Sequence, residues 1–171
     1  MPEQTAQQSL TKSELLQRLQ DGGADAIMRL RAMPEDSFEG GRYESGWNAR
    51  QILAHLSSIE WTYPRLIDGA RGGPPTAPSP AAPATLAAPA APILSYNDRQ
   101  VEKRADYTIG QLLDEFETNR AATIAAVVAA DEELFSRPVR SAGGAQGTLA
   151  EVLNYVAVLH VAMHVKDITG A

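Results

Sequence analysis

The chain contains no cysteine among its 171 residues. This absence excludes a disulfide framework, thiolate metal ligands and a cysteine nucleophile. Basic residues are also in the minority, because 15 Lys and Arg stand against 21 Asp and Glu and give a net charge of −6. Phosphate binding requires a basic stripe on the protein. We therefore expect no nucleic-acid partner.

Long apolar segments are absent as well. The longest apolar stretches fall short of the ~20 residues that span a bilayer, and the N-terminal segment Met1–Thr5 has neither a basic nor an apolar leader region. We therefore expect a cytoplasmic protein without a membrane partner. A chain of 171 residues is typical of one domain with its own core, so residues 1–171 are predicted to form a single domain.

Four segments begin like α-helices. In each, a capping residue stands three positions before Glu or Gln and an apolar pattern of helical period follows. The four segments begin at Thr11–Glu14, Asn48–Gln51, Thr108–Gln111 and Thr148–Glu151. No segment shows sustained strand alternation, so the sequence predicts an all-α four-helix bundle. Its fourth helix is expected to turn inward Leu149, Leu153, Val156 and Met163.

A long connection separates the second and third predicted helices. It runs from Arg71 to Pro92 and is rich in Ala and Pro, a composition that favours exposed, irregular or polyproline chain. One short helix is expected after it, over residues 97–104. Antiparallel neighbours need only a short turn, so this connection permits the second and third helices to run parallel. An insertion without topological meaning is the alternative.

The sequence contains only three histidines, His55, His160 and His164. His160 and His164 stand four residues apart and share one face of a helix, and the helical pattern turns all three side chains towards the bundle interior. Three imidazoles with one open position are typical of a catalytic metal site. A divalent metal held by these residues is one interpretation. Separately hydrogen-bonded core histidines are the other.

Charged residues near these histidines are interpreted more conservatively. Glu60 and Asp167 are the nearest carboxylates in sequence and could orient the histidine rings. Glu60 lies about 140° around the helix from His55, a poor position for a ligand, so we expect both acids to be ordinary surface charges. Arg120 falls on the apolar stripe of the third helix. We expect it to pair with an internal carboxylate in preference to a substrate.

The chain resembles the DinB-like superfamily. Three segments carry the resemblance, in chain order: Gly46–Leu56 followed by Glu60, Tyr107–Leu113 followed by Arg120, and Thr148–Leu153 followed by His160 and His164. The resemblance implies an up-down-down-up bundle in which His55, His160 and His164 hold a divalent metal, usually zinc or nickel, together with water. It also implies a homodimer.

The resemblance implies a class of chemistry as well. Members of this superfamily include S-transferases that use low-molecular-weight thiols such as bacillithiol or mycothiol, and a mycothiol-dependent maleylpyruvate isomerase. Because this chain has no cysteine, a reacting thiol would come from a cosubstrate. We therefore expect a metal-dependent S-transferase acting on small electrophiles. The alternatives are a metal-hydroxide hydrolase and a non-catalytic, stress-related metal-binding protein whose histidines join two helices. No individual catalytic residue is identified.

Overall fold

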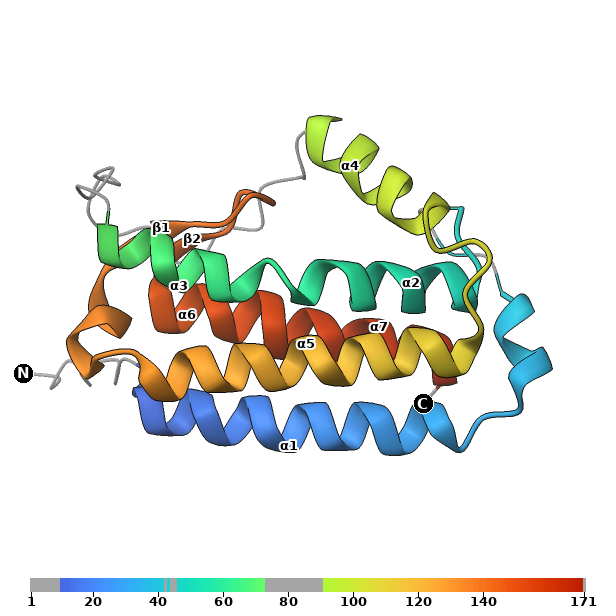
Figure 1. The fold of residues 1–171 in the computed structure, drawn as a ribbon, viewed down its shortest axis with the longest axis horizontal. Coiled ribbons are helices and arrows are strands. Elements are labelled where there is room, and N and C mark those ends of the chain that lie inside the picture. Colours follow the sequence, from blue (N-terminus) through green and yellow to red (C-terminus); the bar gives the residue numbers. More distant parts are fainter. Residues whose placement is uncertain (1–9, 42, 44–45, 73–90, 171) are drawn as a thin grey trace, which may run out of the picture.

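The computed structural model describes residues 10–41, 43, 46–72 and 91–170. Four long helical stretches run side by side in it (Figure 1). They are α1 (Lys12–Arg31), α2 (Ala49–Glu60) with α3 (Tyr63–Gly72), α5 (Ile109–Ala129), and α6 (Leu149–Leu153) continued by the π-helix η3 (Asn154–Leu159) and α7 (His160–Thr169). In Figure 1 the first and last stretches run in one direction and the middle two in the other. The predicted up-down-down-up bundle is therefore confirmed.

All four predicted helix starts form capping boxes. In each box the side chain of the cap accepts a backbone N–H, and a Glu or Gln side chain accepts the N–H of the cap in return. At the start of α2, for example, the Asn48 side chain accepts from the Gln51 N–H, and Gln51 Oε1 accepts from the Asn48 N–H, both at 2.9 Å. Helix starts were predictable because this pairing involves only neighbouring residues.

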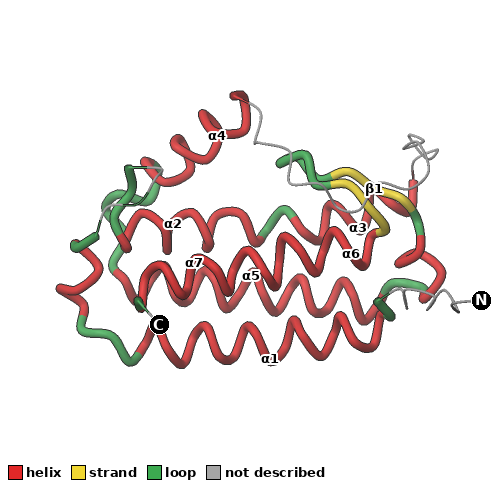
Figure 2. Tube along the Cα trace, turned by 180° about the vertical axis from the view of Figure 1, so that it is seen from behind, coloured by secondary structure: helices red, strands yellow, loops and turns green. Residues whose placement is uncertain are grey.

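The second helix was predicted to be continuous, but it is divided into α2 and α3 at Trp61 and Thr62. Figure 2 shows this break between the two helices as a short loop. Pro64 explains it, because proline has no N–H to offer the carbonyl four residues earlier and its ring clashes with that carbonyl. The carbonyl concerned belongs to Glu60, the last residue of α2.

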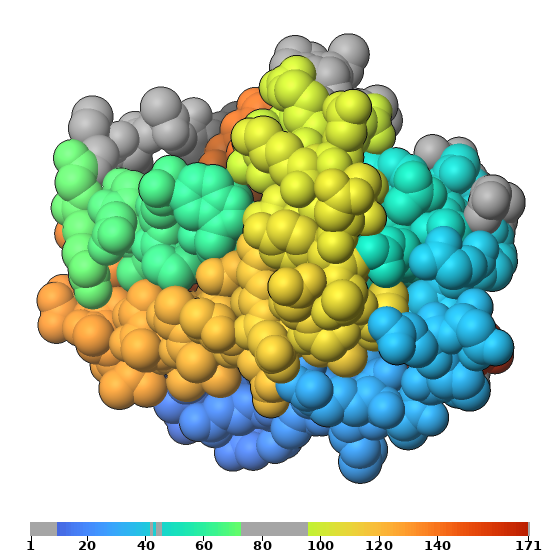
Figure 3. Space-filling model, turned by 45° about the vertical axis from the view of Figure 1, so that its right-hand side comes forward, coloured from blue at the N-terminus to red at the C-terminus, as the bar shows by residue number. Residues whose placement is uncertain are grey.

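Residues 73–90 of the predicted irregular tract lie outside the described residues. The two ends of the predicted tract are helical, because α3 reaches Gly72 and α4 spans Ala91–Glu102. Helix α4 is thus longer than the helix expected over residues 97–104. Helix α4 packs against α2 and projects from the bundle (Figure 1). Its C-terminal part forms a ridge on the face seen in Figure 3.

Two short strands were not predicted. Strand β1 (Pro138–Arg140) pairs antiparallel with β2 (Gln146–Thr148), and Pro138 lies opposite Thr148. Each strand has three residues, too few to show an alternating pattern. Short 3₁₀ helices complete the described chain at Glu35–Glu39 and Glu132–Ser136. No helix in these described ranges is long and apolar enough to cross a membrane.

The buried apolar side chains form two clusters, and a polar pair lies between them along the chain. The first cluster includes Leu56 of α2 and Phe116 of α5, whereas the second includes Tyr63 of α3 and Val127 of α5. The polar pair consists of the buried residues Glu60 and Arg120 (0% and 5% exposed). On each of these two stretches the polar residue therefore falls between the first cluster and the second.

Candidate metal centre

The three histidines converge inside the bundle, as predicted. His55 comes from α2, and His160 and His164 come from the first two turns of α7. The ring centroids of His55 lie 5.5 Å from those of both other histidines, which are 4.5 Å apart. One ring nitrogen of each lies within 4.8 Å of the others. Within the described ranges this is the single group of three or more His, Cys, Asp or Glu side chains so arranged.

The two α7 histidines aim one nitrogen each at a shared point. Their Nε2 atoms are 3.0 Å apart, and two nitrogens on a tetrahedral zinc, each 2.0–2.1 Å from it, would be about 3.3 Å apart. His164 Nδ1 lies 3.3 Å from Asp167 Oδ2. The His160 ring also contacts the backbone of Val156. Each ring therefore turns Nε2 towards the other and has a second polar contact, to Asp167 or to Val156, as metal-bound histidines do.

His55 has a polar atom that the protein leaves unsatisfied. Its side chain is 3% exposed, and its Nδ1 has no hydrogen-bond partner among the described residues. Trp47 packs beside the ring with a centroid separation of 5.2 Å. A buried polar atom without a partner costs roughly 1–3 kcal/mol. A simple His160–His164 hydrogen bond would explain that pair but not His55, whereas a cation shared by three imidazoles accounts for the convergence of all three rings.

Burial keeps the three imidazoles neutral near pH 7. Burial, as the main cause, and the neighbouring imidazoles together lower the pKa of His55 to about 3 and that of His160 to about 4. Burial also lowers the pKa of His164, although the Asp167 carboxylate opposes this shift. Neutral imidazole is the form that binds metals. The rings are therefore in the protonation state that a divalent cation requires.

The π-helix before His160 changes the helix face that the sequence predicted. The buried line is Leu149, Leu153, Ala157, Val161 and Val165, a strict four-residue spacing. In an α-helix four residues advance about 400°, so a line of residues spaced by four moves about 40° around the helix at each step. A π turn has i→i+5 bonds and more residues per turn, so it counteracts this movement. The inward placement of Met163 was therefore wrong, because its side chain is 51% exposed. His160 and His164 each precede a residue of the buried line and are half-buried.

Glu60 is not a surface charge, contrary to the prediction. It is fully buried and pairs with Arg120, whose Nε lies 2.9 Å from Oε1 and whose Nη2 donates to Oε2 at 3.1 Å. The predicted internal pairing of Arg120 is thus confirmed. Burial raises the pKa of Glu60 to about 7, against the opposing charge of Arg120. The absence of any charged residue between Arg50 and Glu60 was a signal that α2 is buried on several sides.

Asp167 also differs from the prediction of an ordinary surface charge. Its side chain is 37% exposed and contacts the His164 ring, and its backbone carbonyl accepts a hydrogen bond from the Tyr43 hydroxyl. Tyr43 thus ties the segment before α2 to α7 next to His164. The carboxylate is in place to fix the orientation of this ring.

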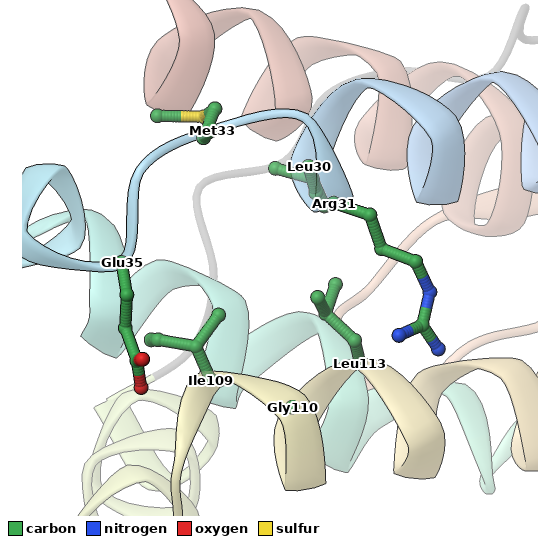
Figure 4. A pocket seen from close by; sticks show the side chains of 7 residues that line it. All are labelled: Leu30, Arg31, Met33, Glu35, Ile109, Gly110 and Leu113. Atoms are coloured by element: carbon green, nitrogen blue, oxygen red, sulfur yellow. The ribbon is translucent and has the colours of Figure 1, made fainter.

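A surface pocket at the end of α1 is separate from the histidines. Its volume is about 320 Å³. Figure 4 shows the residues that line it, which are Leu30, Arg31, Met33, Glu35, Ile109, Gly110 and Leu113. The Arg31 guanidinium is paired with Asp114 at 2.8 Å and with Glu117 at 2.7 Å. Because its cation is already neutralised by two carboxylates, this pocket has no charge available for an anionic ligand.

Comparisons with solved structures agree with this fold. The mycothiol-dependent maleylpyruvate isomerase aligns with a TM-score of 0.70 at 18% identity, over 93% of this chain and 61% of the isomerase, so the chain spans less than two thirds of that protein. YfiT from Bacillus subtilis, described as a probable metal-dependent hydrolase with an unusual four-helix bundle topology, aligns with a TM-score of 0.68 at 17% identity, over 99% of this chain and 90% of YfiT.

An uncharacterised protein from Escherichia coli UTI89 aligns with a TM-score of 0.69 at 14% identity, over 95% of this chain and 92% of that one. At such identities the likeness concerns the fold. No curated protein matches the chain. The sequence profile of the DinB superfamily, however, matches residues 6–168, nearly the whole length. The chain belongs to the DinB superfamily.

Proposed function

We propose that this protein is a metal-dependent enzyme in which His55, His160 and His164 hold one divalent cation. The observation that carries the proposal is the convergence of three neutral imidazoles whose ring nitrogens lie within 4.8 Å of one another. Three nitrogen ligands with an open fourth position are the arrangement of catalytic zinc sites. Zinc and nickel both suit imidazole ligands, so either metal fits the donor set.

The surrounding residues prepare the three rings for this role. Asp167 contacts Nδ1 of His164, and the backbone of Val156 contacts the His160 ring, so both rings keep their direction. Trp47 covers one side of the His55 ring and excludes water there. A bound cation at this position lowers the pKa of a coordinated thiol or water, so that thiolate or hydroxide is present near neutral pH.

The favoured reaction is the transfer of a low-molecular-weight thiol to a small electrophile. The chain has no cysteine of its own, so the nucleophilic sulfur would come from a cosubstrate and would react as its thiolate. One solved structure with this fold is a mycothiol-dependent isomerase, which supports a thiol as cosubstrate. Hydrolysis is the second candidate, because another protein with this fold is described as a probable metal-dependent hydrolase.

Metal analysis and an activity panel test this proposal together. Protein purified without an affinity tag is analysed for metal, reloaded with zinc or nickel, and incubated with thiols plus chlorinated or epoxide acceptors, and separately with esters and amides. We expect bound metal and metal-dependent thiol conjugation. Turnover of esters or amides alone would favour the hydrolase. Bound metal without any turnover would favour a site that only joins α2 to α7, and failure to bind metal after reloading would refute the metal centre.

The homodimer stays a prediction. Leu159 and Met163 are 52% and 51% exposed, four residues apart on the last helical stretch, and could contribute to a two-fold interface. Light scattering at two protein concentrations tests this assembly. A monomer mass that does not change with concentration would contradict it.

A further inference from the structure

Two backbone carbonyls of the π-helix accept hydrogen bonds from side chains of other helices. The Tyr63 hydroxyl of α3 donates to the Val156 carbonyl, and Arg120 Nη2 of α5 donates to the Ala157 carbonyl, both at 2.7 Å. π turns are rare within α-helices and recur at functional sites. This one lies immediately before His160, so contacts that hold it also hold the start of α7.

The Val156 carbonyl links this network to the histidine centre. It accepts from Tyr63 and also contacts the His160 ring. The Tyr63 side chain is 3% exposed, so water competes little for this hydrogen bond. Removing the hydroxyl would therefore release the acceptor that orients His160, without touching any histidine.

Arg120 is fixed at both ends of its side chain. Its guanidinium lies between the Glu60 carboxylate and the Ala157 carbonyl. Its aliphatic stem passes α1 at Gly23, where a Cβ atom would lie only 3.1 Å from Arg120 Cγ. The neighbouring Gly22 is different, because a Cβ there would lie 3.9 Å from Val158 Cγ1, an ordinary contact. The lack of a side chain at Gly23 thus leaves space for the aliphatic part of Arg120.

We propose that Tyr63 and Arg120 are positioning residues for the histidine centre. They hold the carbonyls of Val156 and Ala157, and through them the π turn that sets the direction of the His160 ring. The part of this proposal that concerns metal binding rests on the proposed metal-dependent function. The competing explanation is that the network only stabilises the bundle, in which case its loss would lower stability without changing the geometry of the site.

Ser57 provides a matched control for this distinction. It is fully buried, and its hydroxyl donates to the Leu112 carbonyl of α5 at 2.7 Å, the same kind of interhelical bond as that of Tyr63. It has no hydrogen bond to the π-helix among those of the described residues. Tyr63→Phe and Ser57→Ala each remove a hydroxyl that bonds to a carbonyl of another helix, and Ser57→Ala also removes the contact with the Leu53 carbonyl. Only Tyr63→Phe removes a bond to the π turn.

The decisive experiment compares these two variants with the unaltered protein. Zinc affinity is measured by competition with a chromophoric chelator, and site geometry by the visible absorption of the cobalt(II) form. We expect Tyr63→Phe to weaken zinc binding about tenfold, as loss of an outer contact to a ligand does, and to shift the cobalt spectrum. Ser57→Ala should leave both unchanged. Unaltered affinity and spectrum in Tyr63→Phe, or equal changes in both variants, would overturn the proposal.

A readout on the metal-free protein separates this inference from the metal-centre proposal. The ring ¹⁵N signals of His160 report the contact of its ring with Val156, and we expect Tyr63→Phe to shift them while Ser57→Ala does not. If the protein binds no metal, the proposed function fails and these signals still decide the positioning role. Gly23→Ala and Gly22→Ala form a second pair. The first should shift the same signals by displacing Arg120, the second should not, and equal behaviour would remove Arg120 from the proposal.

Discussion

Two polar clusters lie inside this bundle, and they differ in how their groups are satisfied. Glu60 and Arg120 bring opposite charges within 2.9 Å, and Arg120 also donates to a carbonyl. The histidine cluster brings together three groups of the same kind, and a buried nitrogen of His55 has no partner among the described residues. In the first cluster the protein itself supplies the opposite charge, although Arg120 Nη1 has no hydrogen-bond partner among the described residues. In the second cluster three rings of the same kind converge on one point, which is why we assign it to a ligand.

The two clusters also differ in how accessible they are from solvent. Glu60 and Arg120 are 0% and 5% exposed, whereas His160 and His164 are half-buried. A cation and a substrate need a route to their site, but an internal ion pair does not. The Glu60–Arg120 pair is therefore assigned a structural role, whereas the histidine cluster can be reached by a ligand.

Breaking the ion pair should give the largest effect. Arg120→Met leaves the Glu60 carboxylate buried without its cation, and we expect the free energy of unfolding to fall by about 3–5 kcal/mol. Replacing both residues, as in the double variant Glu60→Leu with Arg120→Met, should recover much of this loss because no buried charge remains. Urea denaturation followed by circular dichroism measures both. A double variant as unstable as the single one would contradict the structural role of the pair.

Removing one histidine should affect metal binding and spare the fold. We expect His160→Ala to weaken zinc binding at least about 100-fold, more than the loss of an outer contact does. The metal-free variant should be no less stable than the metal-free parent, because an imidazole that is buried for the sake of a ligand contributes little without it. Chelator competition and urea denaturation test the two parts. Unchanged zinc affinity would remove His160 from the site.

Acid should destabilise the metal-free protein through the histidines. Their pKa values are lowered in the folded state, so their contribution to stability is complete above the unfolded pKa of about 6.5 and is lost as the pH falls towards the folded values. Between pH 7 and pH 6 the expected loss is roughly 0.7 kcal/mol for each of His55 and His160, whose folded pKa values are about 3 and about 4. Glu60, whose pKa is raised to about 7, acts in the opposite direction.

The difference between the parent and a variant with all three histidines changed to Gln isolates the histidine contribution, because Glu60 is common to both. Stability measured by urea denaturation at the two pH values should decline more steeply in the parent. Parallel declines would show that the histidines are not buried as neutral groups.

Asp167→Ala should give the smallest effect. The carboxylate orients His164 but binds nothing in the proposed centre, so we expect zinc affinity to fall about tenfold. The exposed neighbour Lys166 provides a control, because it lies on the same turn of α7 and Lys166→Ala removes no histidine contact. Equal zinc affinities in these two variants would contradict the orienting role of Asp167.

Most local features were predictable from the sequence, whereas several contacts between helices were not. The capping boxes at Thr11, Asn48, Thr108 and Thr148 depend on residues three apart, and each was identified from the sequence. The break before Pro64 follows from local chemistry too, but the apolar pattern continued across it and concealed the break. The convergence of the histidines was expected from their spacing together with the superfamily resemblance.

The partner of Glu60 could not be deduced from its own helix, because Arg120 lies 60 residues away in the chain. The π turn was equally hidden. It moved Met163 to the surface by changing the number of residues per turn, and no local residue pattern marked that change. Glu60 was thus misplaced because its burial involves a residue of another helix, and Met163 because the π turn rotates the end of its own helix.

X-ray absorption spectroscopy of the zinc-loaded protein tests the central claim most directly. The account predicts three imidazole nitrogens at about 2.0–2.1 Å from the metal and one further light atom that a thiol cosubstrate replaces with sulfur. His55→Ala should remove one imidazole from this shell. A metal shell without imidazole, or one that stays the same in the His55→Ala protein, would contradict the account.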